Sequence, residues 1–251
     1  MKTKSFRVKK ADAAADIALI NQYALAELQP EDVFCFSVVL CDNEVDRDLE
    51  RFTDEALETL AALFVGRTGI KDHAWRTENQ VARVYRAEVE TTDEKTSDGR
   101  TRKQLVAGVY MLRNETTQPL IDSIEGGITK EVSVGFSVRK CTCSVCGAQM
   151  DWLGCPNDHQ KGQVYDGTLC VGLLDEPTDA YEFSFVAVPA QPRAGVTKAA
   201  LAGIFEVLKN ADLSGCGEQI RELMPKFTAA LAGAEERDER RRIIQENKNF
   251  L

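Results

Sequence analysis

The segment Glu131–Val138, which reads EVSVGFSV, restricts the fold of this chain more than any other stretch. In a β-strand, alternate side chains point to opposite faces. One face then carries four bulky apolar side chains that can anchor the strand to a core: Val132, Val134, Phe136 and Val138. The other face carries only Ser133, Gly135 and Ser137. The pattern therefore predicts a core strand with one nearly bare face, on which a serine hydroxyl is raised.

Further strands alternate with helical segments along the chain. Apolar or alternating runs predict strands at residues 33–41, 80–90, 104–112 and 181–190. Helical spacing predicts helices at residues 11–28 and 54–64, and Thr53 and Gly66 are suited to cap the second one. Polar or glycine-rich stretches are interpreted as a hairpin tip, a turn and an acidic loop at residues 91–103, 121–130 and 174–179. Strands interrupted by helices indicate a β-barrel or an α+β core.

The charge and hydropathy of the chain exclude several classes of protein. Lys and Arg total 31 against 40 Asp and Glu, so the net charge of -9 argues against a general nucleic-acid binder. No apolar run approaches the roughly 20 residues of a membrane span. The basic N-terminus is followed by ADAAADIALI, whose two aspartates do not suit a signal peptide. We therefore expect a cytosolic protein whose thiols stay reduced.

Four of the eight cysteines crowd one short segment, CTCSVCGAQMDWLGCPNDHQKG. Cys143-x2-Cys146-Gly147 resembles a zinc knuckle, and Cys155-x3-His159 supplies a second pair of ligands. Two short-spaced pairs match the tetrahedral N/S coordination of Zn²⁺, with Cys141 as a substitute ligand. Four protein ligands leave no position for water, so the pattern predicts a structural zinc site. The remaining cysteines are interpreted as small buried residues: Cys35, Cys41, Cys170 and Cys216.

The histidine count limits the chemistry that Ser133 can perform. The chain has two histidines, and a serine nucleophile needs a base, most often histidine. If His159 binds metal, only His73 in the loop GIKDHAWR is left for that role. Glu182, at the start of a strand expected to bury Phe183, Phe185 and Val188, can orient an imidazole, and Asp179 is the rival carboxylate. On these residues alone, His73 can equally be interpreted as a surface or capping histidine, and Ser133 as an ordinary strand serine.

The motifs DHAW, EVSVGFS and YEFSFVAVPAQPRA, in this order, resemble the caudoviral prohead proteases. The Ser-Val-Gly also resembles the herpesvirus maturational proteases, which share that fold. The resemblance covers roughly residues 33 to 194. It implies a mainly antiparallel β-barrel core with surrounding helices. It also implies a serine endopeptidase with His73 as general base, Ser133 as nucleophile and Glu182 as the orienting acid.

The resemblance also carries expectations about partners and location. Members of the family cut scaffold and capsid-protein segments, and often themselves, inside the immature shell in the host cytoplasm. Self-association is expected, and neither membrane nor nucleic acid is an expected partner. We divide the chain into an N-terminal helical segment (1–32), a protease core (33–198) with an inserted zinc-ribbon-like segment (141–163), and a helical C-terminal region (199–251). The inserted segment is either a staple beside the active site or a docking surface for shell proteins.

Two other functions compete with the peptidase. The first is a non-enzymatic scaffold or assembly protein of the phage head, stapled by zinc and interacting through its C-terminal helices. The second is a cysteine hydrolase that pairs Cys35 or Cys41 with His73. The second is disfavoured because both cysteines lie in an apolar run, where burial would raise their pKa and suppress the thiolate.

Overall fold

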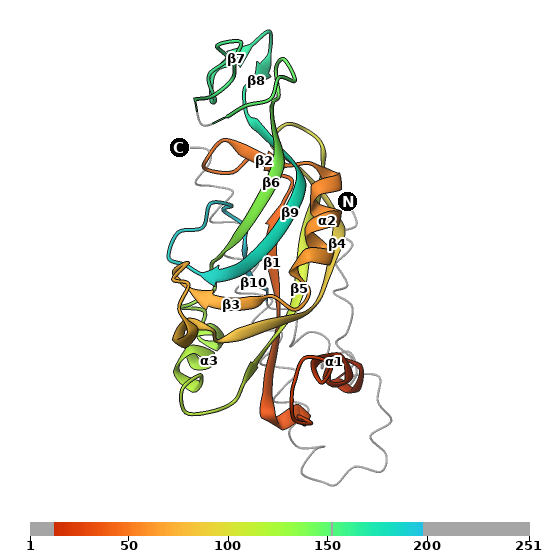
Figure 1. The fold of residues 1–251 in the computed structure, drawn as a ribbon, viewed down its shortest axis with the longest axis vertical. Helices are drawn as coiled ribbons and strands as arrows, with labels where there is room; N and C mark the ends of the chain where they lie inside the picture. The colour runs from red at the N-terminus through yellow and green to blue at the C-terminus, as the bar shows by residue number, and fades with distance from the viewer. Residues whose placement is uncertain (1–12, 152, 198–251) are drawn as a thin grey trace, which may run out of the picture. The chain divides into compact units, whose positions relative to one another are not determined.

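The computed structural model describes residues 13–151 and 153–197. In these residues, eight strands form one mixed sheet in the order β10-β1-β5-β4-β3-β9-β2, with β6 paired to the other edge of β9 (Figure 1). Its strands are β1 (Val33–Asp42), β2 (Glu50–Phe52), β3 (Thr68–Lys71), β4 (Ala82–Lys95), β5 (Thr101–Leu112), β6 (Val132–Cys143), β9 (Gly172–Phe185) and β10 (Gly195–Thr197). The other elements are α1 (Ala13–Ile20), α2 (Asp54–Phe64), α3 (Gln118–Glu125), the 3-10 helices η1 (Pro30–Asp32) and η2 (Thr77–Asn79), and the hairpin strands β7 (Val164–Tyr165) and β8 (Thr168–Leu169). The C-terminal region predicted for residues 199–251 lies outside the described residues.

The α+β prediction is confirmed, but the prediction of a closed barrel is wrong. Most strand pairs are antiparallel, while β9 runs parallel to β2 and β3. β10 pairs with β1, and within the described residues it meets the start of β6 through the isolated bridge Glu131–Gly195. Because β10 is three residues long, it cannot carry a continuous ladder from β1 across to β6. The relation to the herpesvirus-protease fold stays a prediction.

β6 and β9 form the longest pairing around the predicted serine. The register places Val132 opposite Phe185 and Val134 opposite Phe183, so the predicted apolar face of β6 packs with the aromatic face of β9. Val132 and Phe183 are fully buried. Two bulges, after Gly135 and after Ser137, interrupt the register farther along the strand. The strand predicted from EVSVGFSV is therefore confirmed, and it continues to Cys143.

The predicted acidic loop at residues 174–179 is wrong, because this stretch belongs to β9. Its acids lie beside basic residues of β6, with Lys140 Nζ 3.9 Å from Asp175 and Arg139 Nη1 3.6 Å from Glu176. Opposite charges on neighbouring strands favour pairing, and these contacts let an acidic stretch take part in the sheet. The strand also ends at Phe185, before the predicted end at residue 190, and Val188 is 72% exposed where burial was predicted.

The helices show which local signals were sufficient. α2 begins as predicted, because the Thr53 hydroxyl oxygen accepts a hydrogen bond from Ala56 N–H (3.1 Å), and Gly66 follows its end with a positive φ of 84°. The predicted helix 11–28 ends at Ile20, since Asn21 exchanges two hydrogen bonds with the Leu28 backbone and closes a loop instead. α3 was missed; it overlaps the stretch 121–130 that was interpreted as a turn, and it buries two isoleucines.

Candidate functional site

His73 lies just after β3, in a turn that returns the chain toward β9. Asp72 and His73 have positive φ angles of 55° and 50°, a conformation that non-glycine residues adopt only where the surroundings hold them. The holding contacts come from β9: Asp72 N–H donates to Phe185 O (3.0 Å), and His73 N–H donates to Ser184 Oγ (3.0 Å). The loop that the sequence predicted for His73 is therefore a fixed turn.

Glu182 meets the imidazole of His73 from within the sheet. Glu182 Oε1 lies 2.8 Å from His73 Nδ1, and the other carboxylate oxygen accepts a hydrogen bond from Ser184 Oγ (2.7 Å). Glu182 is 2% exposed, whereas the His73 side chain is 42% exposed. Because a carboxylate only accepts, the proton of a neutral imidazole belongs on Nδ1. The lone pair of Nε2 is then free to accept a proton from another group.

Ser133 lies on β6, directly opposite Ser184 on β9. Residues paired across an antiparallel ladder share a face, with Cβ atoms roughly 4.5–5.5 Å apart. Ser133 therefore lies on the same face as Ser184 and Glu182. It is on β6, the strand next to β9, and β9 carries the residues that His73 contacts. Among the described residues, Ser133 Oγ and the His73 ring are not joined by a hydrogen bond. The structure thus joins His73 to Glu182 and leaves Ser133 next to the pair.

Gly135 explains the bare face of β6 in a way the sequence analysis did not foresee. It lies opposite Glu182, and a Cβ built on Gly135 would come 2.4 Å from Glu182 Oε1. The space above Gly135 is therefore filled by the carboxylate that holds His73. Glycine at this position lets an acidic side chain lie flat across the neighbouring strand.

Asp179, the rival carboxylate, makes different contacts. Asp179 Oδ1 accepts a hydrogen bond from Arg67 Nη2 (2.8 Å) and lies opposite Ser137 on β6. The Ser137 hydroxyl contacts Thr178 Oγ1 (2.7 Å) at the exposed surface. Of the two acids that the sequence left open, Glu182 is the one in contact with His73.

An open hollow of about 360 Å³ adjoins Glu182 and was not predicted from the sequence. Trp75, two residues after His73, is 70% exposed, and its ring centroid lies 5.5 Å from that of Tyr181. Arg67 and Arg76 complete a rim with both aromatic and cationic character. The signal that could have indicated this hollow is the pair of aromatic residues beside His73 and Glu182 in the sequence.

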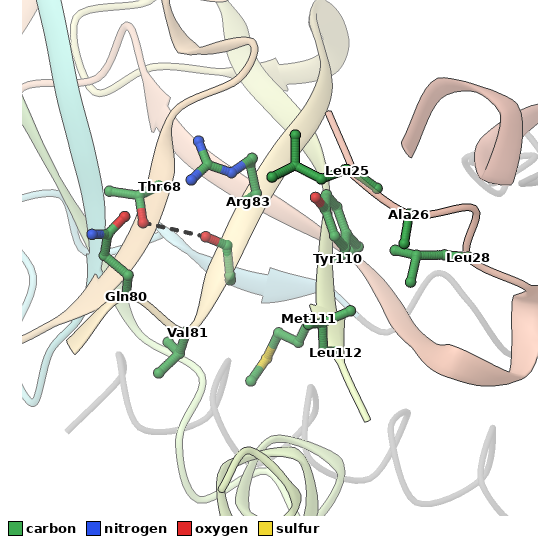
Figure 2. A pocket seen from close by; sticks show the side chains of 12 residues that line it. Leu25, Ala26, Leu28, Thr68, Gln80, Val81, Arg83, Tyr110, Met111 and Leu112 are labelled. Atoms are coloured by element: carbon green, nitrogen blue, oxygen red, sulfur yellow. Dashed lines mark hydrogen bonds between the residues drawn. The ribbon is translucent and has the colours of Figure 1, made fainter. Parts of the chain in front are cut away.

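Figure 2 shows a second pocket, of about 420 Å³, between the loop after α1 and strands β3, β4 and β5. Apolar side chains such as Leu28 and Met111 line it together with Arg83 and Tyr110. Its described lining residues include no carboxylate, imidazole or thiol.

The predicted metal ligands lie together. One ligand atom from each of Cys143, Cys146, Cys155 and His159 falls within 4.8 Å of the others. Individual separations are 3.5 Å between Cys146 and Cys155 Sγ, and 3.7 Å from His159 Nδ1 to Cys143 Sγ and to Cys155 Sγ. A Zn–S bond of about 2.3 Å gives sulfur–sulfur separations of about 3.8 Å in a tetrahedron. The donor set and its dimensions fit a metal ion.

The local fold supports metal binding at Cys146. Gly147, with φ of 71°, turns the chain after the first pair, and its N–H donates to Cys143 O (2.8 Å). Asn157 Nδ2 lies 3.3 Å from Cys146 Sγ, and this hydrogen bond makes the largest contribution, followed by the Ala148 N–H, to lowering the pKa of the Cys146 thiol to about 6. The thiolate is the form that binds metal.

Cys170, predicted to be a small buried residue, packs beside this ligand group without belonging to it. It is fully buried, and its Sγ lies 3.8 Å from that of Cys143. β8 ends at Leu169, so Cys170 returns to the cluster only through the β7–β8 hairpin. Cys141, the predicted substitute, is not part of the ligand group. The cysteines in the described residues are all free thiols, and Cys216 lies outside those residues.

The metal cluster and the His73 site lie at opposite ends of β6. Ser133 is the second residue of the strand and Cys143 is the last, which separates them by roughly 30 Å along an extended chain. Figure 1 shows β6 and β9 running side by side from the β3 region to the β7–β8 hairpin. Of the two roles considered for the inserted segment, a staple directly beside His73 does not fit this separation.

The two cysteines of β1 are poorly suited to nucleophilic chemistry. Burial raises the pKa of Cys35 to about 11, with a further contribution from Asp16. Cys41 is fully buried, and burial raises the pKa of its thiol even further. Both thiols stay protonated at neutral pH, which disfavours a cysteine hydrolase.

Among the described residues, none of the helices has the length and apolar character needed to cross a membrane. Comparisons of the chain with protein-family models, with curated proteins and with solved structures find no match.

Proposed function

We propose that this protein is a serine endopeptidase in which Ser133 is the nucleophile, His73 the general base and Glu182 the acid that orients the imidazole. The observation that carries the proposal is the 2.8 Å contact between His73 Nδ1 and the buried Glu182 carboxylate, on the face that Ser133 shares. A carboxylate–imidazole pair beside a strand hydroxyl is the arrangement that activates serine in acyl transfer.

Each residue has a defined task in this reaction. His73 Nε2 takes the proton from Ser133 Oγ as the oxygen bonds to the substrate carbonyl carbon. Glu182 stabilises the imidazolium, which then gives the proton to the leaving amine as the peptide bond breaks. Water, deprotonated by the same imidazole, hydrolyses the acyl-enzyme. Since the Ser133–His73 hydrogen bond is absent from the described structure, Ser133 must rotate toward the ring when substrate binds, and catalytic contacts are often looser without substrate.

The substrate class follows from the sequence resemblance to the caudoviral prohead proteases. We propose scaffold and capsid-protein segments as substrates, together with sites in the chain itself, inside the phage procapsid. The exposed Trp75 and Tyr181 beside Glu182 offer apolar surface for an extended peptide.

We also propose that the metal of the Cys143–Cys146–Cys155–His159 cluster is zinc, in a structural role. Three sulfurs and one imidazole nitrogen fill a tetrahedral shell and leave no open position for catalysis. The small hydrophobic cluster around Cys143, Met150, Cys155 and Cys170 is too limited to hold this segment folded without a metal.

The same cluster favours a second candidate, a metal-stapled assembly protein without enzymatic activity. Its distance from His73 suits a docking surface better than a part in catalysis. The absence of a Ser133–His73 hydrogen bond in the described residues also favours the assembly protein over the peptidase.

A fluorophosphonate probe separates the two functions. The peptidase reading predicts one covalent adduct on Ser133, located by mass spectrometry, and its loss in Ser133→Ala. Ser137→Ala is the matched control, because it removes a hydroxyl from the same face of β6 and must leave labelling intact. Incubation with the cognate capsid protein should give defined fragments with wild type and none with Ser133→Ala. An unlabelled wild-type protein that leaves the capsid protein intact would exclude the peptidase.

A further inference from the structure

Ser184 holds both halves of the His73–Glu182 pair through a single hydroxyl group. Its oxygen accepts a hydrogen bond from His73 N–H (3.0 Å), and its proton is donated to Glu182 Oε2 (2.7 Å). The residue is fully buried, so water does not compete for either bond. One hydroxyl therefore fixes the backbone of the histidine and the side chain of the acid together.

The bond to Glu182 determines how the carboxylate is oriented. His73 Nδ1 forms a hydrogen bond with Glu182 Oε1, and Ser184 Oγ donates a hydrogen bond to Glu182 Oε2. With a donor on each oxygen and the Gly135 backbone beneath it, the carboxylate plane cannot rotate without breaking one of these contacts. Loss of the Ser184 hydroxyl would leave Oε2 buried without the donor it has now, which is costly for a charged group.

The hydrogen bond from His73 N–H to Ser184 Oγ fixes the backbone position from which the imidazole side chain extends. His73 has φ of 50°, and together with Asp72 it forms a turn of two consecutive left-handed residues. Such a conformation persists only where the surroundings hold it. The His73 N–H bond to Ser184 is the contact that ties this residue's own backbone to β9.

We propose that Ser184 is a positioning residue that sets the orientation of the His73 imidazole toward Ser133. It is not a catalytic residue, because its buried hydroxyl cannot touch a substrate and its proton is committed to Glu182. Ser184 lies directly opposite Ser133 on the neighbouring strand, so the residue that holds the His73–Glu182 pair is next to the proposed nucleophile. The role in catalysis rests on the proposed peptidase function, whereas the role in holding the pair does not.

The test compares Ser184→Ala, Ser184→Cys and Ser184→Thr with wild type in the full-length protein. Ser184→Ala removes the hydroxyl, and Ser184→Cys keeps the approximate volume but offers only a weak donor. Ser184→Thr retains the hydroxyl and serves as the rescue variant. Ser137→Ala, which removes a partly exposed hydroxyl from the same face of β6, is the control.

The first readout is the NMR signal of the His73 ring, which needs no activity. The chain has two histidines, and a His73→Gln variant assigns the signal. Wild type, Ser137→Ala and Ser184→Thr should show a downfield, slowly exchanging Nδ1 proton. In Ser184→Ala and Ser184→Cys this signal should move upfield or be lost to exchange. A wild-type signal in both of these variants would overturn the proposal; if Ser184→Ala does not fold, Ser184→Cys alone decides.

The second readout is peptidase turnover. Misplacement of the imidazole should lower kcat of Ser184→Ala about 10- to 100-fold, with KM changed less than about twofold. Unchanged kcat in a variant that has lost the Nδ1 signal would overturn the role in catalysis. If wild type itself is inactive but the Nδ1 signal depends on Ser184 as described, the peptidase fails and the positioning role stands.

Discussion

Replacing Gly135 with alanine tests whether the bare face of β6 exists to accommodate Glu182. The added Cβ would lie 2.4 Å from Glu182 Oε1 and 3.2 Å from its carboxyl carbon. Gly135 has no positive φ, so the alanine backbone is allowed and the contact with Glu182 is the source of any penalty. The carboxylate must retreat by about 1 Å to reach ordinary van der Waals contact. That movement would stretch the 2.8 Å bond to His73 beyond hydrogen-bonding distance.

The expected cost comes from overpacking at a buried position. Inserting one carbon atom into a closely packed site costs about 1–3 kcal/mol of unfolding free energy. For a domain of this size each kcal/mol lowers Tm by roughly 2–4 °C. We therefore expect Gly135→Ala to lower Tm by roughly 2–12 °C and to abolish the downfield Nδ1 proton signal of His73.

Denaturant unfolding of four proteins measures the effect: wild type, Gly135→Ala, Glu182→Ala and the double variant. If Glu182 lies over Gly135, its removal makes room for the alanine, and the double variant should be more stable than the sum of the single changes by at least about 1 kcal/mol. Ser137→Ala, at a partly exposed position, should change stability by less than about 0.5 kcal/mol. Additive effects of the two changes, or a Gly135→Ala variant as stable as wild type, would refute the reasoning.

Purified protein should contain about one zinc ion per chain by elemental analysis. Cys155→Ser should lose the zinc, whereas Cys35→Ser, which lies outside the cluster, should retain it. Metal content well below one ion per chain in wild type would contradict the site. A second prediction concerns Asp46, whose carboxyl pKa is raised by burial from 3.8 to about 6. Between these values the native state binds the proton more tightly than the unfolded chain, so the contribution of Asp46 to stability falls as pH rises through about 6. Asp46→Asn keeps the side-chain oxygen that accepts hydrogen bonds from the Asp48 and Glu50 amides but cannot titrate. Its stability relative to wild type, measured by chemical denaturation, should therefore rise between pH 4 and 6 and then level off. A constant difference across that range would exclude this titration.

Local sequence signals predicted the elements whose ends are fixed by nearby residues. Thr53 and Gly66 bound α2 because a cap and a left-handed stop act within one turn. The alternation around Ser133 identified β6, since one face of that strand packs against the core. The acidic stretch of β9 was misread because the basic partners of its acids lie on β6, and no local pattern shows that pairing.

The candidate sites divide in the same way. The four metal ligands were predictable because knuckle spacing is a property of a few consecutive residues. The contact of Cys170 with Cys143 could not be predicted in this way, because the β7–β8 hairpin brings the two together from 27 residues apart. His73, Ser133 and Glu182 were named from residue type and resemblance, and residue type alone could not choose between Glu182 and Asp179. The contact with His73 depends on β3 and β6 both pairing with β9.

The sequence by itself determined that this chain forms an α+β fold with a strand cleared around Ser133, a capped helix after Thr53 and a cysteine–histidine cluster. Each of these follows from side chains close together along the chain, where periodicity, capping and ligand spacing act. The tertiary structure decided that Glu182 lies over Gly135, that Ser184 joins it to His73, and that the metal cluster lies at the far end of β6. These contacts join residues about 50 to 110 positions apart, so they exist only once the strands have paired in register, and a shift of one residue would turn every one of them to the opposite face.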